Sequence, residues 1–129
     1  MGLIVAFSTE DGKKLINDHF GEGHLFPVYE LDKDRVTYIK TVENTTGEEE
    51  MHGDSRKAQE ISSLLKPHGV QVLCGRQFGP NIVRMVKKFL PVLVPVDTVD
   101  EALQLLKENY AIIQEEWSKG EQRKYLRLK

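Results

Sequence analysis

The sequence predicts a mixed α/β fold in which helices flank one β-sheet, and three observations lead to this class. Apolar, β-branched runs of strand length recur along the chain. Two of these runs are separated only by Lys33-Asp34, which is typical of a β-hairpin. From residue 58 onward, strand-length runs alternate with segments of helical spacing. That alternation favours parallel strands joined by right-handed helical crossovers.

Length and composition limit the class of protein. A chain of 129 residues with 40% hydrophobic residues is the size of one domain and can bury one core. Its 18 Lys and Arg nearly balance 20 Asp and Glu, so we do not expect nucleic acid as a partner. The single cysteine, Cys74, excludes an intrachain disulfide and fits a reducing compartment. We expect a cytoplasmic protein without a membrane partner, because no apolar run approaches the roughly 20 residues that span a bilayer.

The first part of the chain predicts three strands and a loop. Residues 3–8 form a continuous apolar run, which predicts a strand buried on both faces at the centre of the sheet. Residues 25–32 and 35–42 are rich in β-branched and aromatic residues and predict the two strands of the hairpin. Residues 43–54 are acidic and have no periodicity, which predicts a long loop.

The second part predicts alternating helices and strands. Residues 58–65 have helical spacing, which stops before Pro67. The elements expected after it are a strand at 70–74, a turn at 75–80, a helix over 80–90, a strand at 91–96 and a helix beginning at Thr98. Thr98 and Glu101 have the spacing of a capping box. Residues 110–129 predict a C-terminal appendix that is helical at first, basic toward its end and frayed there.

One short segment concentrates residues that could bind a metal: Asn17-Asp18-His19-Phe20-Gly21-Glu22-Gly23-His24-Leu25-Phe26. Its two glycines permit positive φ, so we expect a sharp turn there. Phe20 and Phe26 could anchor the turn in the core, which would hold the His19 imidazole in a fixed direction. A fixed neutral imidazole is a good ligand for a transition metal. The alternative is an ordinary surface histidine beside a turn.

A second candidate is the turn at 75–80, because ligands in open α/β sheets bind at the carboxyl ends of strands. A helix starting at Pro80 would offer free backbone N–H groups, and Arg76 adds a positive charge. We therefore expect Arg76, Gly79 and Pro80 to bind an anion. Cys74 precedes the turn, and its thiolate could ligate a soft metal. The alternatives are an ordinary connecting turn and a cysteine buried for packing.

The sequence gives little indication of catalysis. His52, in the acidic loop, could supply a further metal ligand or simply be solvated. Motifs of serine hydrolases, dithiol redox proteins and zinc metalloproteases are missing from the sequence. The central strand carries Ser8 where a ribonuclease H-type nuclease needs a carboxylate for its metal ions. We therefore expect a protein without enzymatic activity.

The motifs taken in order resemble a known family. After the apolar first strand come Asp18-His19-Phe20-Gly21, Phe26-x-x-Tyr29, Gly75…Gly79-Pro80 and Thr98-Val99-Asp100-Glu101-Ala102-Leu103. Over about residues 1–108 this pattern resembles the dinitrogenase iron–molybdenum cofactor biosynthesis family, as a stand-alone NifX/NafY-like domain. The resemblance implies a ribonuclease H-like fold with a mixed five-stranded sheet in the order 3-2-1-4-5. It also implies a cofactor-binding domain at 1–109, with 110–129 as an appendix outside it.

The resemblance also implies a function. Family members associated with nitrogen fixation carry the iron–molybdenum cofactor or its iron–sulfur precursor between assembly proteins, and in the cofactor-binding members the histidine of the His-Phe-Gly motif is implicated in binding. That histidine is His19 here, with Asp18, Phe20 and Gly21 positioning the loop. One departure is the turn at 75–80, which is bulkier and more basic than the family's Gly-Gly-x-Gly-Pro type.

Two functions follow as expectations. The first is a non-enzymatic carrier or scaffold for an iron–sulfur or iron–molybdenum-type cluster, with cluster donor and recipient proteins as partners. The protein could then be isolated without its cluster. The alternative is a protein-interaction module without a cluster, whose C-terminal appendix docks on a partner or on a second copy to form a homodimer.

Overall fold

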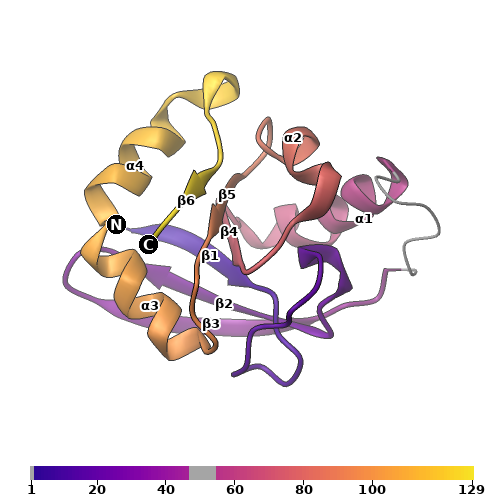
Figure 1. Cartoon of the computed structure of the whole chain (residues 1–129), viewed down its shortest axis with the longest axis horizontal. Coiled ribbons are helices and arrows are strands. Elements are labelled where there is room, and N and C mark those ends of the chain that lie inside the picture. Colours follow the sequence, from indigo (N-terminus) through magenta and orange to yellow (C-terminus); the bar gives the residue numbers. More distant parts are fainter. Residues whose placement is uncertain (1, 47–54) are drawn as a thin grey trace.

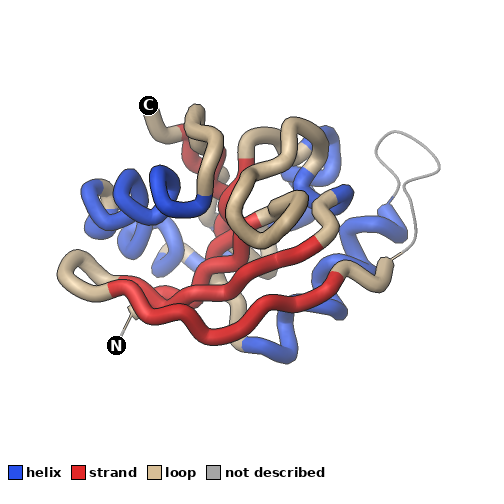
Figure 2. Tube along the Cα trace, turned by 90° about the horizontal axis from the view of Figure 1, so that it is seen from below, coloured by secondary structure: helices blue, strands red, loops and turns tan. Residues whose placement is uncertain are grey.

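The computed structural model describes residues 2–46 and 55–129 and has one six-stranded sheet in the order β3-β2-β1-β4-β5-β6. Helices cover both faces of this sheet (Figures 1 and 2). The strands are β1 (Leu3–Phe7), β2 (Leu25–Leu31), β3 (Val36–Glu43), β4 (Val72–Gly75), β5 (Leu90–Leu93) and β6 (Leu126–Arg127). The α-helices are α1 (Ser55–Leu65), α2 (Ile82–Met85), α3 (Val99–Glu108) and α4 (Tyr110–Ser118). The first five strands have the predicted order, and the sixth was not predicted.

Strand β1 is central, as its continuous apolar run predicts. It pairs antiparallel with β2, where Leu3 lies opposite Leu31, and parallel with β4, where Phe7 lies opposite Cys74. Because side chains alternate along a strand, β1 contributes Phe7 to one face of the sheet and Ala6 to the other. Both side chains are fully buried, so both faces of the sheet carry a core.

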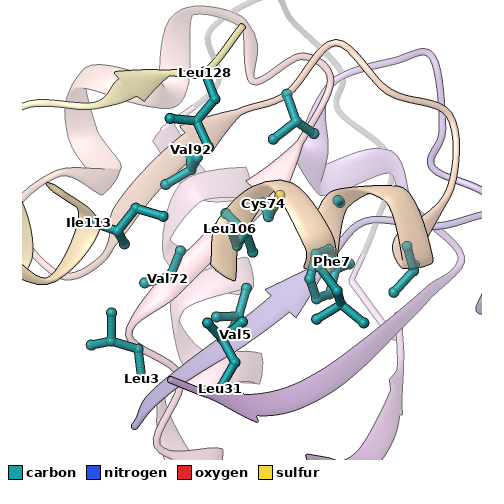
Figure 3. Close-up of a cluster of buried hydrophobic side chains, with 14 of the residues drawn as sticks. Leu3, Val5, Phe7, Leu31, Val72, Cys74, Val92, Leu106, Ile113 and Leu128 are labelled. Carbon is teal, nitrogen blue, oxygen red and sulfur yellow. The ribbon is translucent and has the colours of Figure 1, made fainter. Parts of the chain in front are cut away.

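The two cores contain different helices. One lies under α3 and α4, and Figure 3 shows Val5, Phe7, Val72, Cys74, Leu106 and Ile113 within it. The other lies under α1 and α2 and contains Ile61, Leu65 and Met85. Helix α3 begins as predicted, because Thr98 Oγ1 accepts from the Glu101 N–H and the Glu101 carboxylate accepts from the Thr98 N–H, which forms a capping box.

The predicted helix over 80–90 is wrong in its length. A 3₁₀ turn occupies Gly79–Asn81, and α2 adds only the single turn Ile82–Met85 before the chain enters β5. The segment holds three β-branched residues, Ile82, Val83 and Val86, which have modest helix propensity. A one-turn helix has no extended row of aligned peptide dipoles at its start.

The predicted fraying of the C-terminal end is also wrong. Strand β6 pairs parallel with β5, and the Leu128 N–H donates to the Leu93 carbonyl at 2.9 Å. Leu126 and Leu128 pack on the core under α3 and α4, whereas the alternate residues Arg127 and Lys129 are exposed. This alternation with a period of two is the pattern of a half-buried strand.

Two further predictions concern the loop and the membrane. The predicted loop begins after β3, but residues 47–54, with His52 among them, lie outside the described residues. Within 2–46 and 55–129, no helix has the length and apolar character needed to cross a membrane.

Candidate functional site

His19 lies where the carboxyl ends of β1 and β4 meet. Its backbone forms a parallel bridge with that of Gln77, in the turn that follows β4. The Gln77 Nε2 also donates to Asn17 Oδ1 at 3.2 Å, two residues before the histidine. The structure therefore brings together the two segments that the sequence nominated separately, at the end of the sheet where open α/β folds bind ligands.

The imidazole of His19 packs against Gly79. A Cβ added to Gly79 would lie only 2.7 Å from Cε1 and Nδ1 and 2.8 Å from Nε2 of the His19 ring. Such similar distances to three ring atoms mean that the ring turns its face toward the glycine. Gly79 also has a φ of +70°, which side chains rarely adopt. Position 79 therefore requires glycine for two reasons, the close approach of the ring and the positive φ. The half-buried imidazole is held in one place as a result.

Phe20 anchors the histidine in the core. Its ring is stacked between those of Phe26 and Phe78, with centroid separations of 5.2 Å and 5.1 Å. All three side chains are buried in the core under α1 and α2. The predicted anchoring by Phe20 and Phe26 is confirmed, whereas the contribution of Phe78 was missed. The sequence signal for this contribution was that Phe78 is the one large apolar residue in the turn at 75–80.

Hydrogen bonds hold the backbone around the histidine. Asp18 Oδ1 accepts from the His19 N–H at 2.7 Å, and the Ser8 hydroxyl donates to the Phe20 carbonyl at 2.6 Å. Asn44 Nδ2 donates to the carbonyls of Gly21 at 2.9 Å and Gly23 at 2.6 Å. Asn44 therefore ties the end of the hairpin to the histidine loop, a role that the sequence did not indicate.

Gly21 and Gly23 are needed for close packing, and the sharp turn expected here is present as the 3₁₀ turn Phe20–Glu22. Neither residue is among the glycines of positive φ. A Cβ on Gly21 would lie 3.0 Å from Cε of the buried Lys57 on α1, and one on Gly23 would collide with the Ser8 hydroxyl. The loop thus lies so close to Ser8 and α1 that a side chain at Gly23 would not fit, and one at Gly21 would require Lys57 to shift.

The anion contacts expected at the turn after β4 are only partly supported. Arg76 Nη1 donates to Asp97 Oδ1 at 2.7 Å, which orients a guanidinium whose side chain is 33% exposed. Pro80, by contrast, lies within a 3₁₀ turn that leads only to a one-turn helix, so the expected helix dipole is lacking. Gly79 serves to seat His19. Of Arg76, Gly79 and Pro80, only Arg76 still fits the predicted anion site, because its charged guanidinium is oriented and partly exposed.

Cys74 lies apart from His19. Its side chain is fully buried in the core under α3 and α4, near Phe7, Val92 and Leu106 (Figure 3), whereas the phenylalanines that anchor His19 belong to the opposite core. Burial raises the pKa of the Cys74 thiol well above its usual range, which disfavours the thiolate that a metal needs. We therefore leave Cys74 out of the site, and its role is packing.

The donor set for a metal is small. Among residues 2–46 and 55–129, no three His, Cys, Asp or Glu side chains gather into a group that could hold a metal ion. His52 lies outside these ranges. Of the predicted metal ligands within these ranges, His19 is the one that lies at a partly open surface.

Three comparisons relate the chain to known proteins. The family described as "Dinitrogenase iron-molybdenum cofactor" matches residues 1–109. Protein NifX of Sinorhizobium fredii is 28% identical over 98 residues, which cover 71% of this chain and 59% of that protein. The chain thus spans about three-fifths of this curated relative. A crystal structure from Methanocaldococcus jannaschii, provisionally described as a dinitrogenase, has a TM-score of 0.60 at 20% identity, covering 84% of this chain and 91% of that one. This last similarity shows a shared fold.

Proposed function

The chain belongs to the dinitrogenase iron–molybdenum cofactor family, and we propose that it is a non-enzymatic carrier or scaffold for an iron–sulfur or iron–molybdenum-type cluster. The observation that carries the proposal is the His19 imidazole, seated on Gly79 at the carboxyl ends of β1 and β4. Three buried phenylalanine rings and the Ser8 hydrogen bond fix the residue next to it.

A single fixed ligand suits a cluster that the protein receives from one assembly protein and transfers to another. One imidazole bond can orient a cluster, while a donor or recipient assembly protein supplies or removes the cluster's other contacts. Arg76, held by Asp97, would offset part of the negative charge of a sulfide-bridged cluster. In this proposal the cluster is the substrate of transfer, the cytoplasm is the compartment and the assembly proteins are the partners.

The proposal predicts that retention of metal depends on His19. The protein is incubated anaerobically with ferrous iron and sulfide, or separately with isolated iron–molybdenum cofactor, and desalted before iron and molybdenum are measured per chain. We expect His19→Ala to lower retention about tenfold or more, because disturbing even a partner of a metal ligand weakens affinity roughly 10- to 100-fold.

His68→Ala is the matched control for this experiment. His68 is an exposed histidine in the 3₁₀ turn after α1, where its ring lies beside the Lys40 ammonium. Its loss should leave metal content unchanged. Equal metal content in the wild type and the His19→Ala variant would overturn the role of His19.

A protein-interaction module is the second candidate, favoured by two large apolar side chains in the C-terminal segment 110–129. Ile112 is 56% exposed and Tyr125 is 42% exposed. We expect Ile112→Ser with Tyr125→Ser to abolish any self-association seen by light scattering, whereas Val83→Ser, at another exposed apolar residue, should not. A wild-type protein that stays monomeric at high concentration would contradict docking on a second copy.

A further inference from the structure

A pocket of about 550 Å³ opens beside the histidine site, at the carboxyl ends of β4, β5 and β6. Apolar residues at the end of β5 (Leu93, Val94 and Pro95) form much of its wall. Arg76, Arg127 and Lys129 add three cationic side chains to its lining. A pocket of this size, with mostly apolar walls and a few charged groups, is typical of small-molecule sites.

The C-terminal strand builds one side of this pocket. Arg127 pairs with Leu93 across the β5–β6 ladder, and the buried Leu128 beside it fixes which residues face outward. The pocket therefore includes residues beyond 109, where the match to the family ends. The site is a feature of this chain rather than of the family domain alone.

Arg123 anchors the segment that carries the strand. Its guanidinium lies 4.0 Å from the centroid of the Trp117 ring and donates to the carbonyls of Trp117, Val86 and Lys87. Only 8% of the residue is exposed. Arg127 and Lys129 are thus held at a defined place rather than on a loose tail.

The charges of the lining indicate the kind of ligand. Asp97 binds one of these cations, Arg76, through its Nη1 and orients the guanidinium. Arginine matches the planar geometry of carboxylates and phosphates, and it forms its strongest hydrogen bonds with these anions. We propose that the pocket binds a small molecule that carries a carboxylate or phosphate group on an apolar body.

The test titrates the metal-free protein with phenyl phosphate and, in a second arm, benzoate, while amide resonances of Gln77, Val94 and Leu128 are followed by NMR. Saturable shifts at these amides are expected with at least one of the two anions, and the stronger binder distinguishes phosphate from carboxylate. Phenol, which lacks the charge, and inorganic phosphate, which lacks the apolar body, should each bind about tenfold more weakly.

Two pairs of substitutions test the cationic side chains. Arg127→Gln with Lys129→Gln should weaken binding about tenfold, whereas Lys33→Gln with Arg35→Gln, exposed in the β2–β3 hairpin, should not. Shifts that do not saturate, or an unchanged affinity in the Arg127 and Lys129 variant, would overturn the proposal. Because the test uses metal-free protein and follows binding of the organic anion alone, it can fail independently of the cluster proposal.

Discussion

Gly79 and His19 fix each other's place, which gives a sharp prediction at the scale of single residues. Gly79→Ala would put a methyl group where the imidazole face now lies and should displace the ring without removing it. We expect retention of iron to fall toward the level of His19→Ala. The positive φ at this position should also lower the free energy of unfolding by about 1–2 kcal/mol.

Gly120→Ala separates these two effects. Gly120 has a φ of +62°, and a Cβ there would have nothing within 4 Å. It should lose similar stability in urea unfolding but retain iron as the wild type does. If both alanine variants lost iron equally, backbone strain rather than the displaced imidazole would explain the effect.

The sequence predicted those parts of the candidate site that depend on residues close together in the chain. The spacing of Phe20 and Phe26 around His19 indicated an anchored loop, and the structure confirms that anchoring. The contact of His19 with Gly79 depends on a fold that joins residues 60 positions apart. The face on which Cys74 lies depends on strand register, since its neighbour Leu73 belongs to the opposite core.

At the scale of elements, the β2–β3 hairpin predicts a dependence of stability on pH. Asp32 Oδ1 accepts from the N–H groups of Asp34 and Arg35, both at 2.8 Å, and these bonds lower the pKa of the Asp32 carboxyl below its usual value. The folded carboxyl thus binds a proton more weakly than the unfolded one. It stabilises the fold above the unfolded pKa, and this contribution is lost as the pH falls through the folded pKa.

Asp32→Ala should therefore be less stable than the wild type at neutral pH, and the difference should shrink below about pH 4. Urea unfolding of both proteins between pH 7 and pH 2 measures it. The effect should be small because the group is exposed. A difference independent of pH would show that the turn does not depend on the charge of the carboxylate.

Elements with strong local patterns were predicted, and elements that depend on tertiary contacts were not. The capping box of Thr98 and Glu101 is a local signal, and α3 begins there. The apolar periodicity from Ile82 to Leu90 indicated a long helix. In the structure these apolar residues belong instead to a single helical turn and to the segment that leads into β5. Strand β6 is two residues long and exists because β5 offers it an edge, which no local pattern shows.

At the scale of the whole molecule, residues 110–129 contribute to the same core as the sheet. Ile113 and Leu128 are buried with Val72, Val92 and Leu106 between the sheet and the helices α3 and α4 (Figure 3). The family match nevertheless ends at residue 109. We infer that the domain of this chain extends through its last strand and that the segment is not a detachable appendix.

This inference predicts the cost of removing the segment. Replacing a buried Ile or Leu by Ala typically costs about 2–5 kcal/mol, and a domain of this size is stable by only about 5–15 kcal/mol. Ile113→Ala and Leu128→Ala should each shift the midpoint of urea unfolding markedly, and a chain ending at 109 should lose most of its cooperative unfolding. Ile112→Ala, next to Ile113 but exposed, should change stability by less than about 0.5 kcal/mol. A chain of residues 1–109 with the midpoint of the full chain would instead show that the segment is an independent appendix.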